Sequence, residues 1–216
     1  VGVLSKPVSN DKLFNLQPLY VETMTNGLLR YSCGIYDNND NANTAKNNIV
    51  ETGIRDAFVI AVRDGKRISL SDEKFKNKVV IIQIMGSWCP NCMDETKFLA
   101  DWYSKNRSRG VEVVGLAFEA KDDFTYAAER VKKMKKKLAV AYPVLIAGNK
   151  DKKKASEALP MLSEVVAFPT LIFVDKTGKV KKIHTGFSGP GTGAYYERFI
   201  EEFNATVNEL LADISE

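Results

Sequence analysis

The sequence predicts an α/β fold, and three observations support this prediction. Residues 79–85 (VVIIQIM) form a continuous apolar run about as long as one buried strand. The segment that follows residue 90 repeats its large apolar side chains with the period of a helix. Short apolar strand patterns return at residues 171–174 and 180–185, beyond further helical patterns. Strands that alternate with amphipathic helices are typical of a sheet covered by helices.

Two cysteines lie where the first of these strands gives way to the first helix. Residues 88–92 read Trp-Cys-Pro-Asn-Cys, and Pro90 suits a first helical turn, whose backbone N–H groups lack partners anyway. Cys89 therefore lies at the positive end of the helix dipole, which stabilises the nucleophilic thiolate. Cys92 follows one turn later and can close a disulfide ring. We interpret the pair as a redox-active dithiol.

The cysteine pair has two alternative interpretations. A structural zinc site needs four ligands, and only Cys33 and His184 remain as soft candidates, both distant in the sequence. The pair could also be two unrelated buried thiols. We expect His184 to be an ordinary strand residue and Cys33, on a strand face with Tyr31 and Ile35, to be a buried, inert thiol. The predicted chemistry uses no metal ion and no organic cofactor.

Several ordered segments resemble the thioredoxin superfamily and, within it, the TlpA/ResA-like thiol-disulfide oxidoreductases. The resemblance covers residues 66–211. The matching segments are ISLSD at 68–72, NKVV at 77–80, GSWCPNC at 86–92, GVEVVGL at 110–116, FPTLIFVD at 168–175 and TGKV at 177–180. The resemblance implies a thioredoxin-like, three-layer α/β fold over residues 63–216, with helices on both sides of a central mixed β-sheet. It also implies a Cys89–Cys92 disulfide in the oxidised state.

The resemblance implies further site residues around the dithiol. Pro169 matches the family's cis-proline, which packs against the cysteines and, lacking an N–H, leaves neighbouring backbone groups open to an extended substrate. An ordinary trans proline at the start of a strand is the alternative. Trp88, Pro90 and Phe168 are expected to frame the substrate-contact surface together with Pro169.

The sequence departs from thioredoxins on the strand that precedes the dithiol. Thioredoxins have a buried Asp six residues before the first cysteine, and here that position is Gln83, which cannot accept a proton. We expect Glu119, at the end of the strand 113–118, to supply the functional carboxylate near the dithiol. A solvated strand-end carboxylate is the alternative interpretation.

The remaining elements of this domain follow from periodicity and turn residues. We expect a helix at 124–138 with a solvated lysine face, a short strand at 143–146, a short helix at 155–162 interrupted by Pro160, strands at 171–174 and 180–185 joined by a turn at 176–178, and a last helix at 196–211.

The N-terminal part, residues 1–62, is expected to form a small β-α-β extension. A strand is predicted at 28–35, a helix at 42–53 and a second strand at 56–62, whereas residues 1–18 have no clear period and suggest a linker. The piece resembles one half of a SPOR-like peptidoglycan-binding module. The matching residues are Tyr31, Gly34, Tyr36, Ala45, Gly53, Ala57, Phe58 and Val59. A family-specific elaboration that packs on the redox sheet is the alternative.

Composition limits the location and the partners. The 216 residues carry a formal net charge of +4, and no apolar run approaches the length of a bilayer span. The lysine clusters lack interleaved aromatic residues, so we expect no nucleic-acid partner. The resemblance implies a bacterial cell envelope or periplasmic location, membrane-tethered through a segment absent from this chain. Cysteine content alone fits the cytoplasm equally well.

Taken together, the residues and the resemblance predict a thiol-disulfide oxidoreductase that acts as a reductant. Its partners would be disulfide-containing client proteins and an upstream thiol reductant. A thiol peroxidase of the same fold needs a Thr three residues before the reactive cysteine, and Gly86 occupies that position. An envelope binding module whose redox domain docks clients is the remaining alternative.

Overall fold

A computed structural model describes residues 2–23, 27–36, 39–54, 62–63, 66–67, 74–159, 162 and 164–213. The chain divides into two compact units, Val1–Ile68 and Ser69–Glu216. The domain boundary expected after residue 62 stays a prediction.

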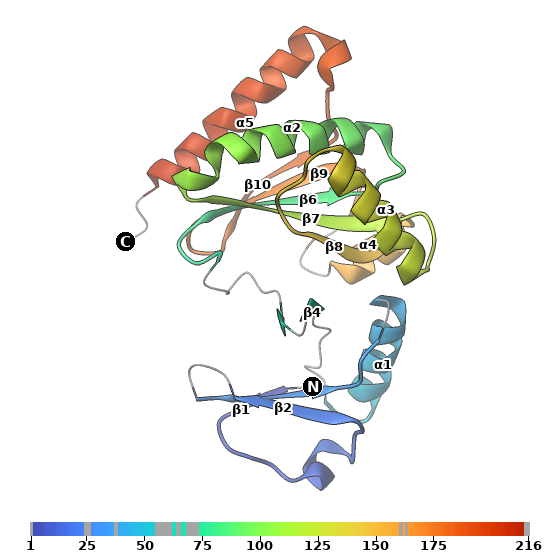
Figure 1. Cartoon of the computed structure of the whole chain (residues 1–216). Coiled ribbons are helices and arrows are strands. Elements are labelled where there is room, and N and C mark those ends of the chain that lie inside the picture. The colour runs from blue at the N-terminus through green and yellow to red at the C-terminus, as the bar shows by residue number, and fades with distance from the viewer. Residues whose placement is uncertain are drawn as a thin grey trace. The chain divides into compact units, whose positions relative to one another are not determined.

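The second unit is built on a five-stranded mixed sheet with the strand order β10-β9-β6-β7-β8 (Figure 1). The strands are β6 (Val79–Met85), β7 (Val111–Glu119), β8 (Val144–Asn149), β9 (Thr170–Val174) and β10 (Val180–Thr185). β6, β7 and β8 are parallel, while β9 runs antiparallel to β6 and β10 antiparallel to β9. This is the central mixed sheet that the sequence predicted.

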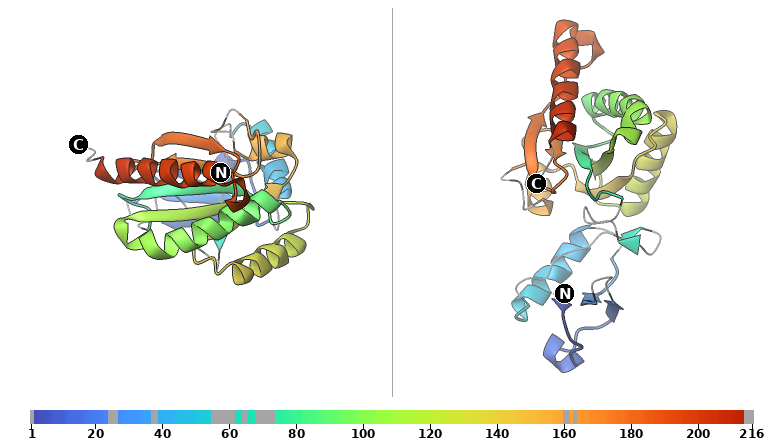
Figure 2. Two further views of the ribbon diagram at one scale, coloured as in Figure 1. Left: turned by 90° about the horizontal axis from the view of Figure 1, so that it is seen from above. Right: turned by 90° about the vertical axis from the view of Figure 1, so that its left-hand side faces the viewer.

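Helices cover both faces of this sheet, which confirms the three-layer α/β prediction. The helices are α2 (Pro90–Asn106), α3 (Phe124–Lys137), α4 (Lys152–Ala158) and α5 (Ala194–Ala212), with short 3-10 turns η2 (Arg107–Arg109) and η3 (Pro190–Thr192). α2 and α3 lie on the same face because β6, β7 and β8 succeed one another in one direction and such crossovers are right-handed. α5 packs beside α2, and α4 lies on the opposite face (Figures 1 and 2).

Burial on both faces explains why β6 reads as a continuous apolar run. Six of its seven residues are buried, and the seventh is half-buried. Parallel strands in the middle of a helix-covered sheet have no solvent face, so they lack the polar–apolar alternation of exposed strands. Gln83 is the one polar member of the run, and its side chain is 1% exposed.

Aromatic side chains fasten α2 and α5 to one another and to the sheet. The Phe203 ring of α5 lies 5.1 Å from that of Phe98 and 5.0 Å from that of Trp102. On its sheet side, Phe203 lies 5.6 Å from Phe173 of β9. All three pairs are edge-to-face, an arrangement that adds to the free energy gained by burial. The N-terminus of α2, which carries the dithiol, is therefore fixed to a rigid layer.

We expect Phe203→Ala to lower the free energy of unfolding by about 3–5 kcal/mol, because it removes a buried ring and leaves a cavity. Urea denaturation followed by circular dichroism would measure this loss. Tyr195→Ala, on the same helix but 71% exposed, is the matched control, with an expected change within about 0.5 kcal/mol. Equal effects of the two substitutions would contradict the assignment of Phe203 to the core.

Helix α4 differs in its position from the predicted helix at 155–162. It begins at Lys152 because the Asp151 side chain caps it, accepting a hydrogen bond of 3.0 Å from the Lys154 amide. It ends at Ala158, and the predicted interruption at Pro160 falls outside the described residues.

The first unit contains a three-stranded antiparallel sheet in the order β1-β3-β2. Its elements are β1 (Gly2–Leu4), the 3-10 turn η1 (Asn10–Leu13), β2 (Leu19–Thr23), β3 (Leu29–Cys33), α1 (Asn39–Glu51), β4 (Val62–Arg63) and β5 (Lys66–Arg67). The predicted strand at 28–35 and the predicted helix at 42–53 correspond to β3 and α1. The linker expected at 1–18 was wrong for Gly2–Leu4, which pairs with β3.

One expectation about the first unit was wrong, and another stays a prediction. Cys33 is half-buried rather than buried, because it is the last residue of β3 and pairs with Leu19 at the start of β2. Most of the predicted second strand, residues 56–62, lies outside the described residues, so the SPOR-like resemblance stays a prediction.

Candidate active site

The dithiol lies at the junction of β6 and α2, where the strand delivers the chain to the start of the helix. Cys89 is the N-cap residue of α2 and has an extended backbone, while Pro90 is the first helical residue. The Cys92 backbone N–H donates a hydrogen bond of 3.3 Å to the Cys89 Sγ atom. An N-cap side chain normally accepts such a bond from an otherwise unpartnered helical N–H. Here sulfur fills that role, so the helix terminus stabilises negative charge on it.

The two thiols have different environments. Cys89 keeps 7% of its surface exposed and Cys92 keeps none. Burial raises the pKa of the Cys92 thiol, and the neighbouring Cys89 and Glu95 side chains raise it further. Cys92 therefore stays protonated while Cys89 is the thiol that an incoming disulfide can reach. Both are free thiols in the structure, which corresponds to the reduced state.

The turn before the dithiol is tied to the end of β7. Glu119 is fully buried, and its two carboxylate oxygens accept hydrogen bonds from the Ser87 backbone N–H, at 2.9 Å, and from the Ser87 hydroxyl, at 2.8 Å. Arg130 of α3 donates to the Ser87 hydroxyl and carbonyl oxygens, both at 3.3 Å. The Trp88 indole N–H donates to the Phe118 carbonyl oxygen at 2.8 Å. The active-site turn is thus held in place by side chains from two other elements.

This arrangement bears on the role expected for Glu119. The sequence places it near the dithiol, and the structure places its carboxylate against Ser87, two residues before Cys89. Both oxygens are occupied by this serine. Such a contact suits holding the turn in place, and a role of Glu119 in proton transfer stays a prediction.

The segment before β9 forms the other wall of the site. The Phe168–Pro169 peptide bond is cis, as the resemblance implied. The Cys89 thiol lies 3.7 Å from the Phe168 carbonyl oxygen, to which it donates a weak hydrogen bond. The Phe168 ring packs edge-on against Trp88, with 5.6 Å between ring centroids. Residues that are 79 positions apart in the sequence thus meet at the reactive sulfur.

The residues that flank Cys89 expose apolar groups, and a lysine lies near one of them. Trp88 is 36% exposed, and Pro90 is exposed between the two cysteines. The Lys150 ammonium lies 5.5 Å from the centre of the Trp88 ring, within the range of a cation–π interaction. An extended polypeptide could cover these side chains while its disulfide approaches the Cys89 sulfur.

Comparisons with known proteins agree with this geometry. The family model described as Redoxin matches residues 44–198. The chain belongs to the Redoxin family. This Redoxin-family chain is 32% identical over 123 residues to the thiol-disulfide oxidoreductase ResA of Bacillus thuringiensis subsp. konkukian, a match that covers 57% of this chain and 62% of that protein. It therefore spans about three fifths of the length of that curated relative.

Two further relatives extend the comparison. Thiol-disulfide oxidoreductase ResA of Bacillus subtilis is 30% identical over 141 residues, which are 65% of this chain and 70% of that protein. A crystal structure of a thiol:disulfide interchange protein of the thioredoxin family from Chlorobium tepidum aligns with a TM-score of 0.51 and 23% identity. That alignment covers 71% of this chain and 93% of the other chain. The TlpA/ResA-like resemblance and the thioredoxin-like fold are thereby confirmed.

The structure adds a site residue that the sequence analysis missed. Glu95 is fully buried on α2, three residues after Cys92 and therefore on the same side of the helix. Its Oε2 atom accepts a hydrogen bond of 2.8 Å from Gln83 Nε2, and its Oε1 atom has no hydrogen-bond partner among the described residues. Burial raises the pKa of Glu95 to about 8, against the effect of the Gln83 hydrogen bond. A signal was present: Glu95 lies in register with the apolar helix face that includes Leu99 and Trp102.

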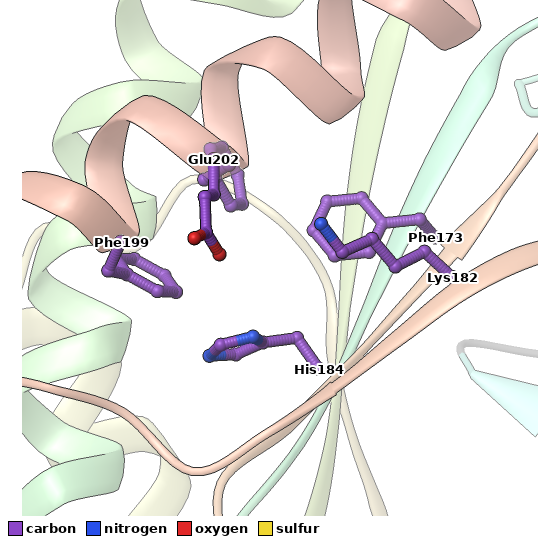
Figure 3. Close-up of a pocket in the computed structure, with 6 residues that line it drawn as sticks. Phe173, Lys182, His184, Phe199 and Glu202 are labelled. Atoms are coloured by element: carbon purple, nitrogen blue, oxygen red, sulfur yellow. The ribbon is translucent and has the colours of Figure 1, made fainter.

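His184 lies elsewhere, in a pocket between β10 and α5. Figure 3 shows His184 and Glu202 facing one another across this pocket, which is lined by Phe173, Lys182, His184, Phe199, Glu202 and Phe203. None of the predicted site residues lines it. Burial lowers the pKa of His184, whose ring lies 5.2 Å from that of Phe199. This half-buried environment agrees with the expectation that His184 is an ordinary strand residue.

The described residues contain neither a metal-binding cluster nor a membrane-spanning helix. In this part of the chain, no group of three or more His, Cys, Asp or Glu side chains could hold a metal ion. Within the same residues, no helix is both long and apolar enough to cross a membrane.

The raised pKa of Glu95 has a consequence for stability. Between the ordinary pKa of 4.5 and the folded value of about 8, the unfolded chain ionises this carboxyl while the folded chain keeps it protonated. Stability therefore falls as the pH rises through this window. Glu95→Gln should abolish this fall. The difference in free energy of unfolding between this variant and the parent should therefore change by about 2–5 kcal/mol in favour of the variant from pH 5 to pH 8.

Urea denaturation of the reduced protein at several pH values would measure the difference between Glu95→Gln and the parent. Glu197→Gln, at an exposed position on α5, is the control and should follow the parent. A difference between Glu95→Gln and the parent that is the same at all pH values would show that Glu95 does not titrate in this window.

Proposed function

We propose that this chain is a thiol-disulfide oxidoreductase that reduces disulfides of client proteins in the bacterial cell envelope. The observation that carries the proposal is the asymmetry of the dithiol. Cys89 caps a helix N-terminus beside exposed apolar side chains, while Cys92 lies fully buried behind it. The relatives named thiol-disulfide oxidoreductase ResA support the same activity.

The first step is attack by the Cys89 thiolate on one sulfur of a client disulfide. The client S–S bond breaks, a mixed disulfide forms between Cys89 and the client, and the other client sulfur leaves as a thiolate that takes a proton from water. The helix N-terminus assists because it stabilises the attacking thiolate. The rings of Trp88 and Phe168 form apolar surface on which the client can lie beside the attacking sulfur.

The second step closes the ring between the two cysteines. Cys92 must lose its proton before it attacks the Cys89 sulfur, and burial opposes that loss. Glu95 supports the step because its carboxylate is buried on the same helix face and has one oxygen without a partner among the described residues. It accepts the proton, the Cys89–Cys92 bond forms, and the second client sulfur leaves as a thiolate. Two electrons have then passed from the dithiol to the client.

This chemistry needs an upstream thiol reductant to return the Cys89–Cys92 disulfide to the dithiol, and it needs no metal ion or organic cofactor. The envelope location rests on the TlpA/ResA-like resemblance and would include a membrane tether outside this chain. Binding of peptidoglycan by the N-terminal unit rests on the SPOR-like residues alone.

The geometry at Gly86 disfavours a thiol peroxidase. A side chain at this position would meet the Trp88 indole nitrogen and, at 2.7 Å, the Phe118 carbonyl oxygen. A Thr that holds a peroxide three residues before Cys89 therefore has no room.

Cys92→Ser tests the proposed order of steps. Without the resolving thiol, the mixed disulfide between Cys89 and the client cannot be released. We expect adducts that survive non-reducing electrophoresis and disappear on addition of dithiothreitol, after expression in the envelope and rapid acid quenching. Cys33→Ser is the matched control and should accumulate no adducts, whereas Cys89→Ser/Cys92→Ser should lose them. Adducts that persist in that double variant would assign the reaction to a different thiol and contradict the proposal.

Redox titration in glutathione buffers tests the direction of transfer. A client reductant should have a midpoint near that of thioredoxin, about −270 mV. Alkylation of the thiols, followed by mass spectrometry, would measure the fraction oxidised. A midpoint between about −120 and −180 mV would instead indicate an oxidant or isomerase.

A further inference from the structure

A buried layer of polar side chains from three parts of the chain is joined to Glu95 through Gln83. Gln83 is on β6, Thr96 is on α2, and Tyr142 precedes β8. All three are buried, at 1%, 0% and 0% exposure. Polar groups this deep need partners, because an unmade hydrogen bond there costs free energy. Each of these side chains bonds to another member of the layer.

The hydrogen bonds fix which way the Gln83 amide faces. Its Oε1 atom accepts from the Thr96 hydroxyl at 3.2 Å and from the Tyr142 hydroxyl at 3.3 Å. Burial raises the pKa of Tyr142, and the neighbouring Glu95 raises it further, so Tyr142 keeps its proton and remains a donor. With two donors on its oxygen, the amide must turn its Nε2 atom to the other side, where it donates to Glu95 at 2.8 Å.

We propose that Gln83 is a positioning residue for the proton acceptor Glu95. Thr96 and Tyr142 hold its amide in one orientation, and the amide N–H stabilises the carboxylate form that receives the Cys92 proton. Gln83 thereby sets the pH above which ring closure is fast. The inference rests on the proposed function, because it assigns Glu95 a step in that reaction.

The charges around Glu95 agree with this assignment. Among the residues that the structure describes, the titratable groups that interact with it are Cys92 on its own helix and Tyr142 in the segment before β8. Both are acids that are neutral when protonated, so neither provides a positive charge to stabilise the carboxylate. Burial raises the pKa of Glu95, and the Gln83 hydrogen bond is the contact that lowers it. Removal of that donor should move the titration of Glu95 to higher pH.

A two-step thiol reaction separates the roles of the residues. The full chain in the reduced state, with Cys33→Ser to remove the third thiol, is mixed with less than one equivalent of 5,5′-dithiobis(2-nitrobenzoate). Attack by Cys89 releases one thionitrobenzoate, and ring closure by Cys92 releases the second. Stopped-flow absorbance resolves the two phases, and the rate constant of the second is followed from pH 5.5 to pH 9.5.

In the parent, the second phase should accelerate as the pH rises through about 8, where Glu95 titrates. Gln83→Leu should move this midpoint upward by about one pH unit and slow the second phase about tenfold at pH 7. The first phase should stay within about twofold of the parent, since the hydrogen bonds given above join Gln83 to Glu95, Thr96 and Tyr142 and not to Cys89. A purely structural role of Gln83 would leave the midpoint in place.

Tyr142→Phe keeps the ring and removes one donor from the amide oxygen, so it tests the same idea if Gln83→Leu does not fold. It should shift the midpoint in the same direction by a smaller amount, because the amide can then turn its oxygen toward the carboxyl for part of the time and accept a hydrogen bond from its protonated form. Glu95→Gln should remove the pH-dependent acceleration, and Gln83→Leu added to it should change nothing more. An unmoved midpoint in the folded variants would overturn the role of Gln83. Absence of the second phase in the parent would instead reject the proposed function.

Discussion

The hydrogen bond from the Cys92 amide to the Cys89 sulfur links the fold of this protein to its chemistry. It exists because β6 ends just before α2 begins, so that a cysteine occupies the N-cap position. A helix N-terminus always presents backbone N–H groups without partners. A sulfur at that point accepts a hydrogen bond from one of these N–H groups. The rest of the second unit serves to keep this terminus fixed and partly open.

Two kinds of contact hold it there. Behind the terminus, aromatic rings of α2 and α5 pack edge-to-face, which makes the helix part of a rigid layer. In front of it, Glu119 and the Phe118 carbonyl oxygen bind the turn that carries Ser87 and Trp88. The first contacts are apolar and set stability, whereas the second are directional and set the position of the reactive sulfur. A substitution among the apolar contacts should therefore change the free energy of unfolding, whereas one among the directional contacts should change the reactivity of Cys89.

The buried carboxyl of Glu95 comes from a different part of the chain than the buried Asp of thioredoxins. The expected position of the acid, on the strand six residues before Cys89, is occupied by Gln83, and the carboxyl comes from the helix instead. Gln83 and Glu95 are 12 positions apart in the sequence, but their buried side chains meet through a hydrogen bond. A neutral amide on the strand therefore donates a hydrogen bond to a carboxyl on the helix.

Much of this protein could be predicted from local sequence. Three patterns are local signals, because the physical causes behind them act within a few residues. They are the apolar run at 79–85, the Cys-Pro-Asn-Cys turn and the strand at 180–185. The same reasoning failed for Gly2–Leu4, a strand of three residues that is specified by its partner β3 rather than by its own pattern. It also failed for Cys33, whose exposure depends on its place at the end of a strand.

The tertiary structure decided which polar side chains meet. Glu95 appeared in the sequence as one charged residue in a helix, and Gln83 as a departure from a family pattern. Only folding brings Tyr142, 59 positions away, onto the same amide and buries all three from water. Backbone conformation is encoded by near neighbours, whereas the strength of an acid depends on solvent exclusion and on partners that the chain supplies from a distance.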